Sequence, residues 1–288
     1  METGRMETAP SPWRTAVRAI AERAEPGVAM PAEARIVLHF HPEADLRGEP
    51  VLRRILEQGR YASQFVTGTS NGGLTARPGG DRWEWESRLF GGAYDEHGPE
   101  HRPAYGALHL DRDPYGAAPR FGSAYLRLRP AVVGRATFVY PDSAFQPRLF
   151  GVAERMRLLE AYRADRVDEP LNRYIEAQVH GGVEVPADVE ALVVDPDFDD
   201  EETLALAEAA GLLIERHPGY RLDLAVVEAN PEYRGPEAVE AAREIAVDGV
   251  LTPTIVGRAR AERRLDPQLV KYVWHHVARF GRTWPVEP

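Results

Sequence analysis

Short runs of apolar, β-branched and aromatic residues dominate the first two thirds of the chain, and amphipathic helical patterns fill the rest. Such runs, bounded by glycine and proline, predict strands at 35–40, 63–67, 105–110, 123–129, 135–140, 174–180 and 189–194. Apolar residues three and four positions apart predict helices at 13–25, 50–58, 152–164, 200–210, 236–247 and 266–280. This mixture predicts an α+β fold, with a mixed or antiparallel split sheet flanked by helices.

The pattern changes near residue 200, where helices begin to alternate with short apolar segments. We therefore expect a disordered tail over 1–12, an α+β core that carries the site over 13–199, and a mainly helical C-terminal region over 200–288 packed on that core. The last two strands of the core are separated by a short segment rich in glycine. That spacing suits a hairpin or a sharp corner.

Composition narrows the classes of function. The chain has 288 residues, no cysteine and a formal net charge of −10. The negative charge argues against generic binding to nucleic acid or an anionic membrane, and the lack of cysteine excludes thiolate metal sites and cysteine nucleophiles. Neither a long apolar run nor a signal peptide is evident, so we expect a cytoplasmic protein with no membrane partner. Lys271 is the only lysine, which reflects either GC-rich coding or a need for arginine clamps on anions.

A glycine-rich and aromatic-rich stretch over 60–125 is the first candidate for a site, because long loops often carry function. Arg60 precedes a predicted strand and could clamp a diphosphate through two parallel hydrogen bonds. The residues that could present hydroxyl and N–H groups to the same anion are Thr69, Ser70, Asn71 and Gly72. The alternative is a surface arginine followed by an ordinary β-turn.

A second candidate is the strand start at 122–125. Gly122 would let a ligand approach the backbone closely. Ser123 could donate a hydrogen bond, and Tyr125, two residues on and on the same face, could stack on a flat ring. The alternative is a core strand with a packed tyrosine.

A third candidate is the alternation Glu176-Ala177-Gln178-Val179-His180. In a strand, Glu176, Gln178 and His180 project to one face. A carboxylate, an amide and an imidazole in line indicate either a site or an ordinary solvent-exposed sheet face.

His39 and His41 form a further pair, because residues two apart in a strand share a face. Two imidazoles could hold a metal ion, with His180 and Asp195 or Asp197 as further ligands. The alternative is a strand-end pair that makes backbone hydrogen bonds.

Several long segments carry a resemblance to a known family. HFHP, GRYASQFVTGTSNGGLT, WEWESRLFGGAY, YGALHL, PRFGSAYLRLRP and YIEAQVHGGVEV resemble the bacterial family named domain of unknown function 3626, over roughly residues 35–280. That family name implies no activity.

The order Arg60, Ser123, Glu176 is similar to the Arg–Ser–Glu order of ADP-ribosyltransferases. The resemblance implies that Arg60 holds the diphosphate of NAD, that Ser123 braces the glutamate, and that Glu176 stabilises the oxocarbenium-like transition state. Tyr125 would stack on nicotinamide. The chain departs from the pattern at Gln178, where a Glu-x-Glu pair usually ends in glutamate, and it lacks a Ser-Thr-Ser brace.

The resemblance thus implies a transferase that uses NAD as a substrate, needs no metal, and passes ADP-ribose to an acceptor such as a protein. The alternatives are a metal-dependent hydrolase built on His39 and His41, or a non-enzymatic ligand-binding protein. The transferase requires Arg60, Ser123 and Glu176 to converge on one cavity.

Overall fold

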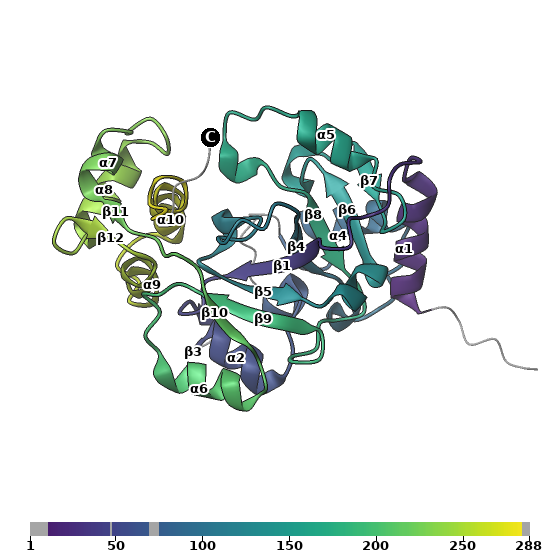
Figure 1. Ribbon diagram of the computed structural model, residues 1–288, viewed down its shortest axis with the longest axis horizontal. Coiled ribbons are helices and arrows are strands. Elements are labelled where there is room, and N and C mark those ends of the chain that lie inside the picture. Colours follow the sequence, from purple (N-terminus) through teal and green to yellow (C-terminus); the bar gives the residue numbers. More distant parts are fainter. Residues whose placement is uncertain (1–10, 47, 69–74, 284–288) are drawn as a thin grey trace, which may run out of the picture.

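The computed structural model describes residues 11–46, 48–68 and 75–283. Its centre is an eight-stranded sheet in the order β10-β9-β5-β1-β4-β8-β6-β7, with helices around it (Figure 1). The strands of this sheet are β1 (Arg35–Phe40), β4 (Ala104–His109), β5 (Ala124–Leu128), β6 (Ala136–Tyr140), β7 (Leu149–Gly151), β8 (Glu176–Val179), β9 (Val189–Val194) and β10 (Ile214–Arg216). Neighbouring strands are antiparallel except β9 and β10, which run parallel. The predicted α+β class is confirmed.

Ten α-helices lie in the described part of the chain: α1 (Pro12–Arg23), α2 (Val51–Gln58), α3 (Gln64–Thr67), α4 (Asp81–Leu89), α5 (Leu158–Ala164), α6 (Glu201–Ala209), α7 (Leu224–Glu228), α8 (Pro236–Ile245), α9 (Pro253–Ala261) and α10 (Pro267–Phe280). There are also two short two-stranded sheets in the described residues, one of β2 (Asp45–Leu46) with β3 (Glu49–Pro50) and one of β11 (Leu222–Asp223) with β12 (Val250–Leu251).

Two local predictions are wrong. The run 63–67 forms the short helix α3 instead of a strand, and Gly68 ends it with a φ of 71°. The strands β8 and β9 do not form a hairpin, because β8 lies between β4 and β6 whereas β9 lies between β5 and β10. The polypeptide therefore crosses three strands of the sheet between residues 179 and 189.

The two faces of the sheet are covered differently. On one face, Leu38, Leu126 and Phe138 belong to the largest hydrophobic cluster, which includes residues of α2, α5 and α6. On the opposite face, α1 and α4 cover the end of the sheet around Val139. The centre of that second face carries a smaller cluster around Val37, and the cavity described below opens there.

The C-terminal helices α7–α10 form a separate hydrophobic cluster, centred on Val273, Trp274 and Val277. Figure 1 shows them grouped at the end of the molecule opposite α1. The sheet itself continues past residue 199, since β10 is its edge strand and α6 packs on α2. Residues 1–10 of the expected tail lie outside the described residues. In the part of the chain that the structure describes, no helix is both long enough and apolar enough to cross a bilayer.

Candidate functional site

A large cavity opens over the central strands of the sheet. Its floor includes Val37 and His39 of β1, Tyr105 and Ala107 of β4, and Glu176 of β8. Because Ala107 pairs with both Val37 and Glu176, these residues lie across three adjacent strands. The cavity encloses about 1460 Å³ of empty space, a volume that includes the part open to solvent.

Positive charge dominates the cavity walls. Five arginines line it, namely Arg54, Arg60, Arg82, Arg120 and Arg260, whereas its carboxyl groups are those of Asp142 and Glu176. In the described part of the chain none of the five forms an ion pair, although many other arginines do. A chain of net charge −10 thus gathers five guanidinium groups and only two carboxyl groups around one hollow, an arrangement that favours an anionic ligand.

Glu176 is the buried acid of this cavity, with 6% of its surface exposed. Its Oε2 accepts hydrogen bonds from the Ser143 hydroxyl at 2.7 Å and the Ser143 backbone N–H at 3.3 Å. Its Oε1 accepts from the Gln178 amide at 2.9 Å. Burial raises the pKa of Glu176, and the nearby Arg82 opposes that rise.

A line of buried polar groups holds Gln178 behind this acid. The Thr137 hydroxyl donates to Gln178 Oε1 at 2.8 Å and lies 2.9 Å from His180 Nε2. His180 Nδ1 lies 2.7 Å from the Tyr94 hydroxyl. Burial lowers the pKa of His180 to about 3, so its imidazole is neutral and can accept from Tyr94 while donating to Thr137. Every donor in this line then points towards the Glu176 carboxyl group.

A second line of contacts fixes the arginine next to Glu176. Arg82, on α4, donates to the Ser143 hydroxyl at 2.8 Å and lies 4.4 Å above the Tyr105 ring. The Tyr105 hydroxyl donates to Glu86, which also accepts from Arg102 at 2.7 Å. Tyr105, Glu86 and Arg102 are thus linked to one another by hydrogen bonds. The contacts with Ser143 and Tyr105 fix the guanidinium group of Arg82 beside the acid.

Most of the chain resembles one protein family. A model described as a protein of unknown function, DUF3626, matches residues 35–165 and 154–279. The chain belongs to the DUF3626 family. A comparison with curated proteins found no match. The match covers the sheet, the cavity and the helices α7–α10 of this DUF3626 chain, so the cavity walls lie within the family region.

The DUF3626 cavity brings together only some of the residues that the sequence singled out. Arg60 and Glu176 both line it. The Arg60 guanidinium donates to the Glu100 carbonyl at 2.8 Å, and the backbone of Arg60 bridges to Glu184. Thr69, Ser70, Asn71 and Gly72 lie outside the described residues. Gln178 and His180 do not line the cavity and act on it through Glu176.

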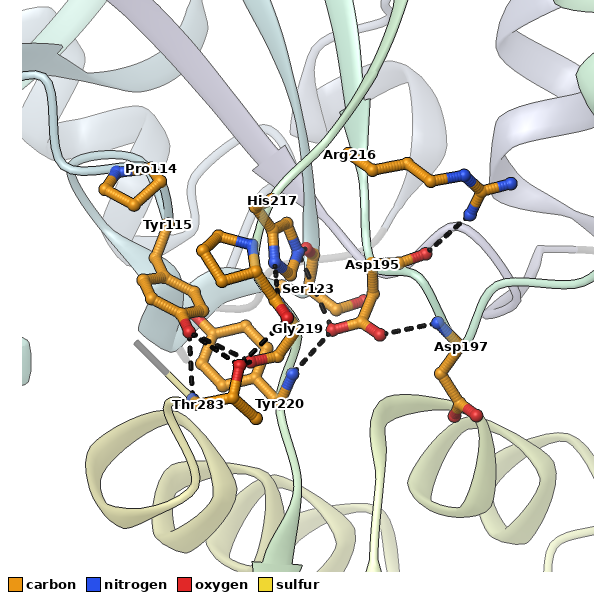
Figure 2. A network of polar contacts seen from close by, with 12 residues as sticks. Pro114, Tyr115, Ser123, Asp195, Asp197, Arg216, His217, Gly219, Tyr220 and Thr283 are labelled. Carbon is orange, nitrogen blue, oxygen red and sulfur yellow. Dashed lines mark hydrogen bonds and ion pairs between the residues drawn. The ribbon is translucent and has the colours of Figure 1, made fainter. Parts of the chain in front are cut away.

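Ser123 lies elsewhere. Its backbone carbonyl accepts from His217 Nε2 at 2.8 Å, in the polar network drawn in Figure 2. Its hydroxyl is buried and has no hydrogen-bond partner among the described residues. Ser143 instead makes the contact with Glu176 that was expected of Ser123. Gly122 is required by the fold, since a Cβ there would lie 2.1 Å from the Phe40 carbonyl group of β1.

Tyr125 also lies outside the cavity lining. It is buried in the cluster around Val37, with its ring 5.1 Å from that of His39 and its hydroxyl donating to the Pro114 carbonyl at 3.1 Å. Tyr105 and Tyr174 are the tyrosines on the walls next to Glu176. The packed-tyrosine alternative therefore describes Tyr125.

His39 and His41 both line the cavity. His39 is held between the Gly122 carbonyl at 3.2 Å and the Ala118 N–H at 3.3 Å, and His41 packs edge-on against Trp274. Burial lowers the pKa of each to about 3.

The further ligands proposed for a metal lie in other networks. Asp195 accepts from the backbone N–H groups of Asp197 and Tyr220 (Figure 2). Asp197 accepts from the N–H of Thr254 at the start of α9. Across the described ranges, no three or more His, Cys, Asp or Glu side chains group so as to hold a metal ion.

Sequence reasoning missed Ser143, Arg82 and Tyr105. Ser143 is 33 positions from Glu176 along the chain, and Arg82 is 61 positions from Ser143. A usable signal was the Pro-Asp-Ser sequence directly after β6, because polar residues at the end of a buried strand often face a site. Arg82 was missed because the glycine-rich and proline-rich segments around it were interpreted as loops, so that no helix was predicted at α4.

Proposed function

We propose that the chain binds NAD in the arginine-lined cavity, cleaves its nicotinamide–ribose bond and passes ADP-ribose to an acceptor. The observation that supports this proposal is the pairing of one buried carboxyl group, that of Glu176, with five arginines free of described ion pairs in the same cavity. A diphosphate needs cationic clamps. A developing oxocarbenium ion needs one preorganised negative charge.

In the proposed reaction, the bond between ribose C1 and the nicotinamide nitrogen breaks, and its electron pair leaves with nicotinamide. The ionised Glu176 stabilises the positive charge that develops on the ribose. A nucleophilic group of the acceptor then bonds to C1 and releases its proton to solvent. Ser143 and Gln178 hold the two Glu176 oxygens, and thus act as positioning residues.

The removal of this charge tests the proposal. We expect Glu176→Gln to reduce the release of nicotinamide from NAD by about 10²-fold or more, because one preorganised electrostatic contact contributes on that scale. The amide keeps the size of the side chain but turns one acceptor into a donor that faces Ser143 or Gln178, so the melting temperature should fall somewhat, and turnover is compared at a temperature where both proteins are folded. Glu208→Gln, an exposed substitution on α6, is the matched control. Full turnover by Glu176→Gln would refute the proposal.

The pH profile provides a second readout of the same residue. Only the ionised form of Glu176 can stabilise a cation, and burial raises its pKa above the ordinary 4.5. Activity should therefore fall, as the pH is lowered, at a higher pH than for an exposed glutamate.

A further inference from the structure

A second hollow continues the cavity beneath helices α9 and α10, and we call it the α9–α10 hollow. It holds about 750 Å³ of empty space, counting its opening to solvent. The two hollows share the lining residues His41, Ala44, Arg120, Phe121 and Arg260. A molecule in the α9–α10 hollow would thus lie next to whatever occupies the main cavity.

The α9–α10 hollow is also positively charged. Arg120, Arg260 and Lys271 line it, and its lining contains no aspartate or glutamate. Within the described ranges, none of the three forms an ion pair. One carboxyl group, that of Glu43, packs behind this wall against Gly257, and burial raises its pKa to about 7, so it is only partly ionised at neutral pH.

Without a ligand, one N–H of Arg120 lacks a hydrogen-bond partner in the described part of the chain, and Lys271 lies in an environment that disfavours its charge. The Nε of Arg120 is buried without a hydrogen-bond partner among the described residues. Lys271 is half-buried, and its pKa is lowered by burial and by the neighbouring Arg120 and Arg234. A bound anion would satisfy the free N–H and relieve the repulsion between the cations.

The rest of the lining limits what the anion can be attached to. Val256, Val270, Phe121 and Trp274 supply apolar surface around the charges. The indole N–H of Trp274 is already used by the Pro119 carbonyl at 3.0 Å. A compact oxyanion on a partly apolar molecule suits this combination of cationic and apolar side chains.

We propose that the α9–α10 hollow binds a phosphate or carboxylate group of the second substrate, the acceptor. Its identity as the acceptor subsite rests on the proposed function, whereas the binding of an oxyanion at Lys271 does not. The C-terminal region thereby supplies half of the site, with Lys271 as its compact point charge.

Because Lys271 is the only lysine, protein labelled with [13Cε]lysine gives one lysine side-chain signal. We expect inorganic phosphate, or acetate if the group recognised is a carboxylate, to shift this signal saturably and to raise the Lys271 pKa. NAD alone, whose diphosphate would lie near the shared Arg120, should raise that pKa less than the responding anion does. No response to either anion, or the same rise with NAD alone, would overturn the proposal.

Variants supply an independent measurement by calorimetry. Lys271→Met and Arg260→Met should each weaken binding of the responding anion at least about tenfold, as expected when a close charge pair is lost. Lys271→Arg should retain binding. The control is Arg258→Met, an exposed position on α9 that faces Asp199, and it should bind like the parent chain. Unchanged affinity in both Lys271→Met and Arg260→Met would overturn the assignment.

The two proposals fail separately. A chain that binds an oxyanion at Lys271 but does not release nicotinamide refutes the proposed function and leaves an anion site. A chain that releases nicotinamide, but whose Lys271 signal ignores both anions, refutes the subsite alone.

Discussion

At the scale of single residues, Glu176 and Gly122 show two different constraints on the same sheet. The Glu176 carboxyl group is held by donors on both oxygens, so its position is fixed before any ligand binds. Gly122 has no side chain because the backbone of β1 occupies that space. The first residue serves the chemistry that we propose, and the second serves the packing of the strands beneath it.

Gly122→Ala should destabilise the protein strongly. The new methyl group would lie 2.1 Å from the Phe40 carbonyl carbon and oxygen, and a rigid strand cannot move away cheaply. We expect a loss of about 3 kcal/mol or more in the free energy of unfolding, as for other severe overpacking.

Gly134→Ala is the matched control, because no atom lies within 4 Å of a Cβ built there. It should change stability by less than about 0.5 kcal/mol. Urea denaturation of both variants measures the difference. Equal stabilities would show that the β1 backbone yields at Phe40.

At the scale of elements, the sequence predicted what local patterns encode. The strands β1, β4, β5, β6, β8 and β9 and the helices α2, α6, α8 and α10 follow their apolar periodicity. The helix α4 was missed because it buries the charged side chains of Arg82 and Glu86. Its inward face is therefore not apolar. The separation of β8 from β9 was missed because strand order depends on contacts distant along the chain.

The same distinction applies to the site. The alternation around Glu176 predicted a shared face for Glu176, Gln178 and His180, since period-2 patterns are local, and the structure buries all three and places Glu176 on the cavity wall. Ser143 and Arg82 come to it from other segments, and no spacing within one segment encodes such contacts. The serine that was chosen, Ser123, satisfied the sequence order but lies in a different polar network.

Helix α2 allows a test of the arginine clamp with two adjacent residues. Arg54 lines the cavity, whereas Arg53, about 100° around the helix, pairs with Glu202 at 2.7 Å and Glu57 at 3.2 Å. We expect Arg54→Met to raise the KM for NAD about tenfold, because a charge contact to the diphosphate is lost.

Arg53→Met should leave the KM unchanged and lower stability by at most about 1 kcal/mol, as for exposed ion pairs. Steady-state kinetics of the two variants side by side measure the contrast. A similar KM in both variants would show that the clamp lies elsewhere in the cavity.

At the scale of the whole molecule, buried histidines dominate the response to acid. Burial lowers the pKa of seven of the nine histidines, which are His39, His41, His109, His180, His217, His275 and His276. Four buried carboxyl groups oppose them, because burial raises the pKa of Glu43, Glu86, Glu176 and Asp195.

Stability should therefore fall as the pH is lowered below about 6.5. Between that value and the lowered native pKa, each histidine binds a proton only on unfolding, and the stability it contributes above pH 6.5 is lost. The four carboxyl groups act with the opposite sign, in a window that ends at about 7 for Glu43 and Glu86 and at about 6 for Asp195. Where all eleven groups contribute in full, seven histidines less four carboxyl groups leave three protons, or about 4 kcal/mol per pH unit.

Urea midpoints measured between pH 5 and pH 7 test this balance. His180→Phe removes one of the seven contributions and should flatten the dependence. Stability that rises steadily from pH 6.5 down to pH 5 would contradict the expected sign.

The main cavity and its extension lie where two separately packed clusters meet, one built on the sheet and one on α7–α10. Polar contacts lie at this junction (Figure 2): His217 donates to the Ser123 carbonyl next to β5, and Tyr115, whose ring belongs to the α7–α10 cluster, donates to the Gly219 carbonyl. The width of the cavity therefore depends on how the two clusters pack against each other. A ligand that contacts both clusters stabilises their association. The separation of the clusters in the free protein sets the size of ligand that the cavity admits.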